Sequence, residues 1–406
     1  MNTITKAPRR APAPLPVAKP ELGEAEADAA RRAILSGWVT QGPEVEAFER
    51  EFAAYVAAPH ACAVSSCTAA LHVALVAVDI GPGDEVITAS HSFIATANAI
   101  RYVGAVPVFA DVDLQSGNLD PDQVAAAIGP RTRAILAVHQ VGMPADLARL
   151  LALADRHGLA LIEDAACAVG SELAWQGGWQ RIGRPHGRIA CFSFHPRKLL
   201  TTGDGGMLTT ADPVLDAAFR RLRQHGMTVS DRDRHAAATV VREGYDRVGF
   251  NYRLTDIQAA VGREQLKRLP DMVAHRRAQV GHYRSLLGAC AAIQLPQEPN
   301  WARTNWQSFV VMLRSQAIRD RAMAQLLEAG IATRPGVMTS HREAAYQTDP
   351  WRCVAGPGAC GCAPGTCVRL AASEARRDRG LTLPLFHAMT EADIARVADA
   401  LIGAVA

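Results

Sequence analysis

Short apolar runs alternate with helical patterns through the first two thirds of the chain. Seven runs have the length and composition of buried strands, at residues 61–65, 85–88, 106–110, 134–139, 160–163, 189–194 and 207–210. Helical patterns lie between many of them, at residues 69–78, 95–103, 121–128 and 147–157. Strands that alternate with helices predict βαβ units and a mostly parallel sheet covered on both faces. Ligands of such sheets bind beyond the carboxyl ends of the strands, so the candidate chemistry is expected there.

The two ends of the chain follow other patterns. Residues 1–18 lack periodicity and are rich in proline, which predicts a flexible leader. Further helices and one strand are expected, with helices at 21–35, 45–55, 274–287, 318–329 and 391–404 and the strand at 308–313. The rhythm changes near residue 265, which predicts an α/β chain with a large domain at 19–265 and a smaller α+β domain at 266–406.

Composition agrees with a globular protein. The chain has 406 residues, of which 49% are apolar and 20% charged, enough for two hydrophobic cores. Its 43 basic and 40 acidic residues give a net charge of +3, which is too small to indicate electrostatic binding to nucleic acid or to a membrane surface. The sequence has no apolar run long enough to span a bilayer and no signal-peptide core, so we expect a cytoplasmic protein.

Cysteine usage argues against a secreted scaffold, because nine cysteines are few for this length. Four of them gather near the C-terminus, at Cys353, Cys360, Cys362 and Cys367. The spacing C-x6-C-x-C-x4-C could supply four thiolates to zinc, but it lacks the paired C-x2-C units of typical zinc sites. The alternative is a loop with free or partly oxidised thiols, and we predict no metal site.

Two predicted strands end in residues with candidate chemistry. Small residues at 65–69 lead into a helix, where free backbone N–H groups suit a phosphate, although Ser66 or Thr68 could equally be an ordinary helix cap. Asp164 closes the run at 160–163, and its carboxylate could bind a metal, cap a helix or hold a protonated ring nitrogen.

Two later segments add an amine and further donors. Lys198 follows the strand at 189–194 and precedes a glycine-rich turn at 203–206. A partly buried lysine can have its pKa lowered enough to form an imine with a carbonyl, although a surface lysine is the plain alternative. Ser193 can donate its hydroxyl to a phosphate. The segment at 249–258 carries amide and guanidinium donors before a helix that Thr255 could cap.

A lysine, a strand-end acid and a phosphate cup together match the needs of pyridoxal 5'-phosphate. Two rival cofactor classes fit less well. A nicotinamide enzyme would carry G-x-G-x-x-G after the first strand, and Gly81-Pro82-Gly83 lacks the third glycine. The phosphate-binding loop G-x-x-x-x-G-K-[ST] does not occur in the sequence.

The chain resembles the StrS-type sugar aminotransferases of the DegT family, a branch of the fold-type-I pyridoxal-phosphate enzymes. The resemblance is close over about residues 20–290 and looser beyond. It rests on ordered motifs, among them SSCTAALHVAL (65–75), LIEDAACAVG (161–170), SFHPRKLLTTGDGGML (193–208) and GFNYRLTDIQAAVG (249–262). It implies an aspartate-aminotransferase-like fold, with a mostly parallel central sheet in the large domain and a smaller α+β C-terminal domain.

The resemblance also implies roles for individual residues. Lys198 matches the lysine that binds the cofactor covalently and moves the proton, and Asp164 matches the acid that pairs with the pyridine nitrogen. Thr68 and Ala69, with Ser193, match the phosphate-binding positions.

Two further positions carry implications for stacking and assembly. Phe93 matches the aromatic residue that stacks on the cofactor ring, with a plain core phenylalanine as the alternative. Asn251 matches an asparagine that reaches the phosphate of the neighbouring subunit's cofactor, which implies a homodimer with shared active sites. Arg253 in the same loop could contact substrate or simply lie at the surface.

Three positions depart from the family pattern. Cys67 stands where glycine is usual, which adds a side chain to the phosphate cup. Cys167 stands where glutamine or histidine is usual, near the cofactor's phenolic oxygen, and a thiol is a poor hydrogen-bond partner. Asp204 replaces a common glutamate, a small change. Cofactor tuning or substrate choice is therefore expected to differ in this chain.

The family implies an aminotransferase that moves an amino group from glutamate or glutamine to a keto sugar, expected to be a nucleotide-linked keto-deoxysugar of polysaccharide or secondary-metabolite biosynthesis. Thr40, Gln41 and His341 are candidate substrate contacts or structural residues. One alternative is a related sugar dehydratase, in which histidine replaces the lysine, so Lys198 argues against it. Another is a cofactor-binding regulator without turnover, which no DNA-binding segment supports.

Overall fold

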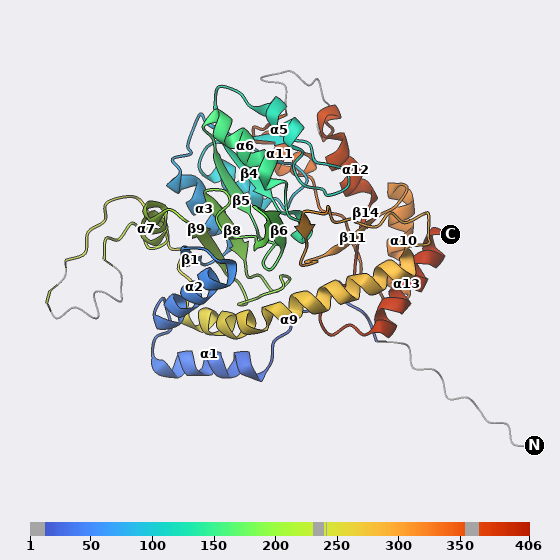
Figure 1. Cartoon of the computed structure of the whole chain (residues 1–406), viewed down its shortest axis with the longest axis horizontal. Coiled ribbons are helices and arrows are strands. Elements are labelled where there is room, and N and C mark those ends of the chain that lie inside the picture. The colour runs from blue at the N-terminus through green and yellow to red at the C-terminus, as the bar shows by residue number, and fades with distance from the viewer. Residues whose placement is uncertain (1–12, 230–238, 241, 354–364) are drawn as a thin grey trace, which may run out of the picture.

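An eight-stranded sheet with the order β1-β9-β8-β5-β4-β2-β3-β13 runs through the larger lobe (Figure 1). The computed structural model describes residues 13–229, 239–240, 242–353 and 365–406. The strands are β1 (His60–Val64), β2 (Glu85–Ala89), β3 (Val106–Ala110), β4 (Thr132–Val138), β5 (Ala160–Asp164), β8 (Ile189–Ser193), β9 (Gly206–Thr210) and β13 (Arg352–Cys353). Only β9 runs antiparallel to its neighbours in this sheet, and every other pair is parallel, which confirms the predicted sheet.

Helices cover both faces of the sheet. One face packs against α3 (Cys67–Ala77), α4 (Ala95–Tyr102) and α7 (Pro213–Leu222). The other packs against α2 (Pro43–Val56), α5 (Pro121–Ala127), α6 (Leu147–His157) and the first half of α9 (Asp256–Leu287). Strands buried on both faces need apolar side chains in both directions, which is why they read as continuous apolar runs.

The smaller lobe has its own core around a three-stranded antiparallel sheet. The sheet consists of β11 (Phe309–Met312), β14 (Gly380–Leu383) and β12 (Arg334–Pro335), with β12 at its edge. Its core includes apolar residues of α10 (Gln316–Glu328), α13 (Glu391–Val405) and the second half of α9. The remaining elements of the described residues are α1 (Glu24–Ser36), β6 (Glu172–Trp175), β7 (Gly178–Arg181), β10 (Ala302–Arg303), α11 (Ala345–Thr348), α12 (Ala371–Arg379) and the short 3-10 turns η1 (Gln140–Gly142), η2 (Ser340–Arg342) and η3 (Val368–Leu370).

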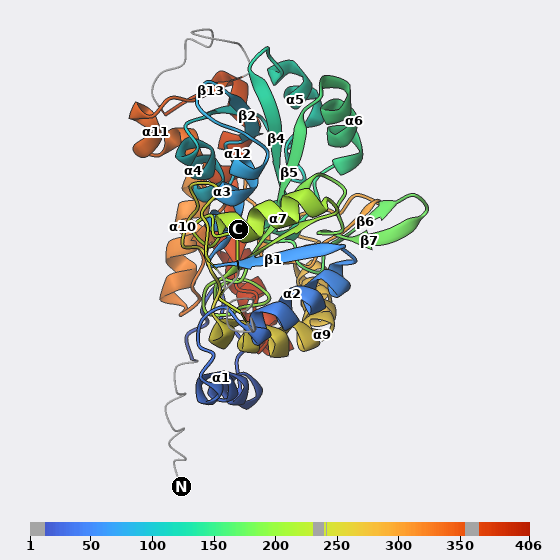
Figure 2. The same ribbon diagram turned by 90° about the vertical axis from the view of Figure 1, so that its left-hand side faces the viewer.

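Helix α9 passes beneath both lobes and connects them (Figures 1 and 2). The cap predicted at Thr255 is confirmed, because its hydroxyl accepts the N–H of Gln258 at 3.2 Å. The helix continues past Pro270, which lacks an N–H to donate. The domain boundary predicted at residue 265 falls inside this helix, so the two lobes share one continuous element.

Residues 13–18 are fastened to the smaller lobe, unlike the flexible leader predicted for 1–18. Leu15 is buried and pairs with Ile331 in a β-bridge. The N–H of Leu385 donates to the carbonyl of Val17 at 3.1 Å. The apolar side chain of Leu15 packs against the smaller lobe, a contact that the proline-rich sequence does not indicate. Residues 1–12 lie outside the described residues.

The cysteine cluster is only partly within the described residues. Cys353 lies in β13 and Cys367 precedes η3, and both are buried beside Tyr346 and Leu370. Cys360 and Cys362 lie outside the described residues. Among the residues that the structure describes, no group of metal-ligating side chains occurs, and no helix there is long and apolar enough to cross a membrane.

Candidate active site

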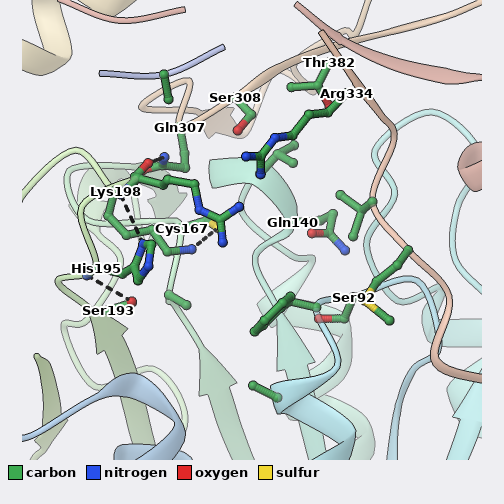
Figure 3. A pocket seen from close by; sticks show the side chains of 18 of the residues that line it. Ser92, Gln140, Cys167, Ser193, His195, Lys198, Gln307, Ser308, Arg334 and Thr382 are labelled. Atoms are coloured by element: carbon green, nitrogen blue, oxygen red, sulfur yellow. Dashed lines mark hydrogen bonds between the residues drawn. The ribbon is translucent and has the colours of Figure 1, made fainter. Parts of the chain in front are cut away.

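A cavity of about 800 Å³ opens at the carboxyl edge of the central sheet (Figure 3). The segments after β1, β2, β4, β5 and β8 line one side of it, and the smaller lobe lines the other. Seven of the nine predicted cofactor residues meet there, namely Cys67, Thr68, Phe93, Asp164, Cys167, Ser193 and Lys198. Parallel strand order explains this convergence, because every parallel strand ends at the same edge.

Asp164 is the last residue of β5 and is almost fully buried. Its Oδ2 accepts the hydroxyl of Thr96 at 2.7 Å, and its Oδ1 accepts the N–H of Ala166 at 3.2 Å. Thr96 in turn contacts the hydroxyl of Ser92 at 2.8 Å. These contacts orient the carboxylate toward the cavity that it lines.

Lys198 points into the cavity and donates from Nζ to Sγ of Cys167 at 3.0 Å (Figure 3). Burial lowers the pKa of Lys198, but the contact with Cys167, together with Cys67 and Asp164, offsets this effect and raises the pKa overall. The pKa of Lys198 therefore lies above its ordinary value. This is opposite to the lowered pKa considered from the sequence, where the neighbouring thiol could not be seen.

The predicted phosphate cup lies where β9 begins between two strand ends. Gly206 pairs with Val64 at the end of β1 and with Ser193 at the end of β8. A Cβ on Gly206 would lie 2.5 Å from the carbonyl of Ser66, so glycine is required for this approach. Ser66 caps α3, since its hydroxyl accepts the N–H of Ala69 at 3.1 Å.

That cap divides the predicted phosphate-binding positions. Ala69 is buried, already donates its N–H to Ser66, and is not among the cavity-lining residues. Cys67 and Thr68 line the cavity in the first turn of α3, whose N–H groups have no partner within the helix. The Sγ of Cys67 faces the carbonyl of Cys191 at 3.7 Å, and burial raises the pKa of this thiol well above its ordinary value, with Asp164 adding to the rise.

Phe93 lines the mouth of the cavity and is 62% exposed, so it is not a core phenylalanine. Asn251 is exposed and bridges to Gln224, outside the cavity of its own chain. Arg253 is partly buried and also lies outside the cavity lining.

The three candidate substrate contacts do not line the cavity of this chain either. His341 is buried, with Nδ1 2.6 Å from the Ser90 hydroxyl and Nε2 3.1 Å from Glu374. The side chain of Gln41 donates to Gln224 at 3.4 Å, and the carbonyl of Thr40 accepts the N–H of Asp256.

Sequence reasoning missed the residues that the smaller lobe contributes. Gln307, Ser308, Arg334 and Thr382 line the far side of the cavity, and Gln140 of the large lobe lines it as well (Figure 3). The segments of the four smaller-lobe residues carry no strand-end or motif signal, and only the tertiary fold brings them to the site. Gln140 directly follows the run predicted at 134–139, and Thr96 lies in the helix predicted at 95–103, but neither was singled out from the sequence.

The site fits pyridoxal phosphate. It offers a partly buried amine, an oriented carboxylate, an aromatic ring at the mouth, and a helix N-terminus beside a serine hydroxyl. Gly206 lets β9 pass close to Ser66 at the start of α3, and this close approach agrees with the binding of a phosphate there.

Comparisons with known proteins identify the family. The model of the DegT/DnrJ/EryC1/StrS aminotransferase family matches residues 20–402. The spore coat polysaccharide biosynthesis protein SpsC of Bacillus subtilis (strain 168) is 41% identical over 299 residues, 74% of this chain and 76% of SpsC. The aminotransferase TlmJ from Streptoalloteichus hindustanus superimposes with a TM-score of 0.85 at 31% identity, over 97% of this chain and 99% of TlmJ. DesV of S. venezuelae superimposes with a TM-score of 0.84 at 35% identity, over 97% of this chain and 98% of DesV. The chain therefore belongs to the DegT/DnrJ/EryC1/StrS aminotransferase family, whose members use pyridoxal phosphate.

Proposed function

We propose that the enzyme transfers an amino group from glutamate or glutamine to a nucleotide-linked keto sugar, in polysaccharide or secondary-metabolite biosynthesis. The observation that carries the proposal is the placement of the Lys198 amine and the Asp164 carboxylate in one cavity. The similarity to SpsC, a protein named for polysaccharide biosynthesis, supports a sugar acceptor. We further propose that the enzyme works in the cytoplasm as a homodimer.

Five features of the chain would hold the cofactor: Lys198, Asp164, Phe93, Ser193 and the N-terminus of α3 around Cys67 and Thr68. When bound, pyridoxal phosphate supplies an electron sink for the carbon that carries the amino group. Asp164 would hold a proton on the ring nitrogen, since Thr96 and Ala166 fix the direction of its carboxylate.

Lys198 would move the proton at the reacting carbon. Its Nζ can take and return a proton once it is released from covalent attachment, which is general acid–base catalysis. Cys167 holds Nζ at 3.0 Å in the cavity, so it would keep the amine close to the position where the proton is needed.

The two alternative readings have less support. A related sugar dehydratase would have histidine in place of Lys198. A regulator without turnover does not agree with membership in an aminotransferase family.

The test follows the absorbance of the bound cofactor. The enzyme loaded with pyridoxamine phosphate is mixed with a panel of keto-sugar nucleotides, and the true substrate should return the pyridoxal absorbance. Lys198→Ala should bind the cofactor but lose amination by at least about 10²–10⁴-fold, the contribution of general acid–base transfer alone.

Borohydride reduction provides the matched control. It should fix the cofactor to the peptide that contains Lys198 in the wild type and in Lys267→Ala, a variant of an exposed lysine paired with Glu264. Trapping on another lysine, or full activity of Lys198→Ala, would refute the assignment.

A further inference from the structure

The charged groups that line the cavity are mostly occupied by protein partners. Asp164 accepts from Thr96 and Ala166, Asp204 accepts the N–H of Gly205 at 2.9 Å, and Lys198 donates to Cys167. Burial lowers the pKa of His195, and nearby Arg197 lowers it further, so this imidazole is neutral at pH 7. The remaining charged residues in the lining are two arginines, Arg197 and Arg334.

Arg334 lies in edge strand β12, opposite Thr382 of β14, and its side chain extends into the cavity (Figure 3). Arg334 is exposed, and among the described residues no hydrogen bond or ion pair to its guanidinium is found. The other smaller-lobe residues that line the cavity are apolar or uncharged. Arg342 of the same lobe contrasts with it, because it is paired with both Glu374 and Asp378. A guanidinium that faces a cavity without a protein partner keeps its planar fork of donors for a ligand.

The position of Arg334 separates it from the cofactor's own anion site. Ser193 and Arg334 project from different sides of the cavity in Figure 3, one from the end of β8 and the other from the smaller lobe. Arg197 belongs to the turn just before Lys198, on the large-lobe side. An anion between the two arginines would therefore bridge the lobes close to the reacting amine.

We propose that Arg334 is the specificity residue that anchors an oxyanion of the substrate, with Arg197 as a second, large-lobe contact. The ligand chemistry is a carboxylate or a phosphate, whose paired oxygens match the guanidinium fork. Two sources can supply it, the carboxylate of the amino donor or the diphosphate of the nucleotide sugar. The assignment of these two sources rests on the proposed function. The presence of the anion site does not depend on it.

The first experiment measures binding rather than turnover. Isothermal calorimetry on the cofactor-loaded protein uses glutarate as the dicarboxylate probe and inorganic pyrophosphate as the phosphate probe. Arg334→Gln should weaken the binding of one probe by about 10- to 100-fold, the value of a lost charge-assisted contact. Arg334→Lys should restore part of it, because a lysine keeps the charge but not the fork.

Arg314→Gln is the matched control, an exposed arginine of the smaller lobe that does not line the cavity. It should bind both probes as the wild type does. The cofactor absorbance and retention of Arg334→Gln should also be unchanged, since the phosphate cup belongs to the large lobe. The anchor is overturned if the wild type binds neither probe, or if Arg334→Gln binds both as tightly as the wild type.

Turnover then separates this inference from the proposed function. A raised KM for glutamate in Arg334→Gln identifies the donor carboxylate as the ligand, and a raised KM for the sugar identifies the diphosphate. Normal amination with both KM values unchanged removes the anchor and keeps the function. Probe binding that depends on Arg334, in an enzyme that aminates no keto sugar, keeps the anchor and removes the function.

Discussion

Lys198 has a sulfur atom as its partner, and this contact sets its protonation. Burial alone lowers the pKa of the amine, whereas the Sγ of Cys167 at 3.0 Å, together with Cys67 and Asp164, raises it overall. In the cofactor-free protein the lysine is therefore a cation at neutral pH. Formation of a covalent link to a cofactor requires the neutral amine, so we expect the contact with Cys167 to slow this step while it positions the nitrogen.

Cys167→Ala should lower the pKa of Lys198, because the effect of burial remains and the offset is lost. Each unit of lowering gives up to about tenfold more neutral amine below the pKa. At pH 9 the variant should therefore react faster with acetic anhydride at Lys198 in the cofactor-free protein, as read by peptide mass spectrometry. The exposed Lys267 in the same sample serves as the internal reference, and equal rates at Lys198 in both proteins would contradict the argument.

The segment between β10 and β11 is hydrogen-bonded to the two loops that carry Cys167 and Lys198. The side-chain amide of Asn305 donates to the carbonyls of Cys167 and Val169 at 2.9 and 2.8 Å. Gln307 accepts the N–H of Leu199 at 2.9 Å and donates to the carbonyl of Arg197 at 2.5 Å, on either side of Lys198. This short stretch of the smaller lobe thus holds both active-site loops of the large lobe in register.

Gln307→Ala should loosen the turn around Lys198 without removing any group from the chemistry. Two lost hydrogen bonds, worth about 0.5–1.5 kcal/mol each, should lower the thermal midpoint and slow borohydride trapping at Lys198. Gln294→Ala, at an exposed position outside the cavity, is the control. Unchanged trapping in a destabilised Gln307→Ala would show that the contact serves stability alone.

A buried ion-pair cluster joins α2, β1 and α7. The carboxylate of Glu49 accepts the N–H of Ala63 and pairs with Arg220 and Arg223. Burial raises the pKa of Glu49, but Arg223 and Arg220 lower it by more, so the pKa lies below its ordinary value of 4.5. A lowered carboxyl pKa stabilises the fold above that ordinary value, and the stabilisation is lost as the pH falls through the folded-state pKa.

Glu49→Gln should destabilise the protein by about 3–5 kcal/mol near pH 7, because Arg223 would stay buried without its partner. The gap to the wild type should shrink at a pH well below 4.5, where the wild-type carboxyl takes up its proton through its lowered pKa. Urea unfolding at both pH values measures this. Glu51→Gln in the same helix, whose pair with Arg263 is partly exposed, should cost about 0–1 kcal/mol. A pH-independent gap for Glu49→Gln would contradict the linkage.

The molecule as a whole was predictable from the sequence in its large lobe and less so in its smaller one. The run at 106–110 and the helical pattern at 147–157 coincide with β3 and α6, because strands covered on both faces and amphipathic helices leave strong periodic signals. β14 is only four residues long, and α12 is dominated by charged residues without an apolar stripe, so both were missed.

The candidate site divides in the same way. Lys198 and Asp164 were found because they follow buried strands, and the parallel sheet brings such positions together. Gln307 and Arg334 reach the cavity only through the packing of one lobe against the other, which no local pattern records. Cys167 was noticed as a departure, but its contact with Lys198 depends on two loops 31 residues apart in the chain.

At the level of assembly, Asn251 provides the test. It is exposed and lies outside the cavity of its own chain, which leaves it available to a second subunit. We expect a homodimer by light scattering, and Asn251→Ala should retain the dimer but lose cofactor about tenfold more readily on dialysis, since a contact to a charged phosphate is removed. An active monomer, or unchanged cofactor retention in the variant, would count against a shared site.

Pro16, Val17 and Ala18 form part of the cavity wall, although they lie at the opposite end of the chain from the lobe that holds them. Leu15 of the same stretch belongs to the core of the smaller lobe, so an exchange that keeps a leucine at this position can alter the wall and leave both hydrophobic cores intact. Recombination between relatives near residue 20 would therefore replace this part of the cavity wall in one step. The residues at the strand ends, among them Asp164 and Lys198, would stay unchanged. We expect such an exchange to change which substrates fit the cavity without a change in the residues that carry the chemistry.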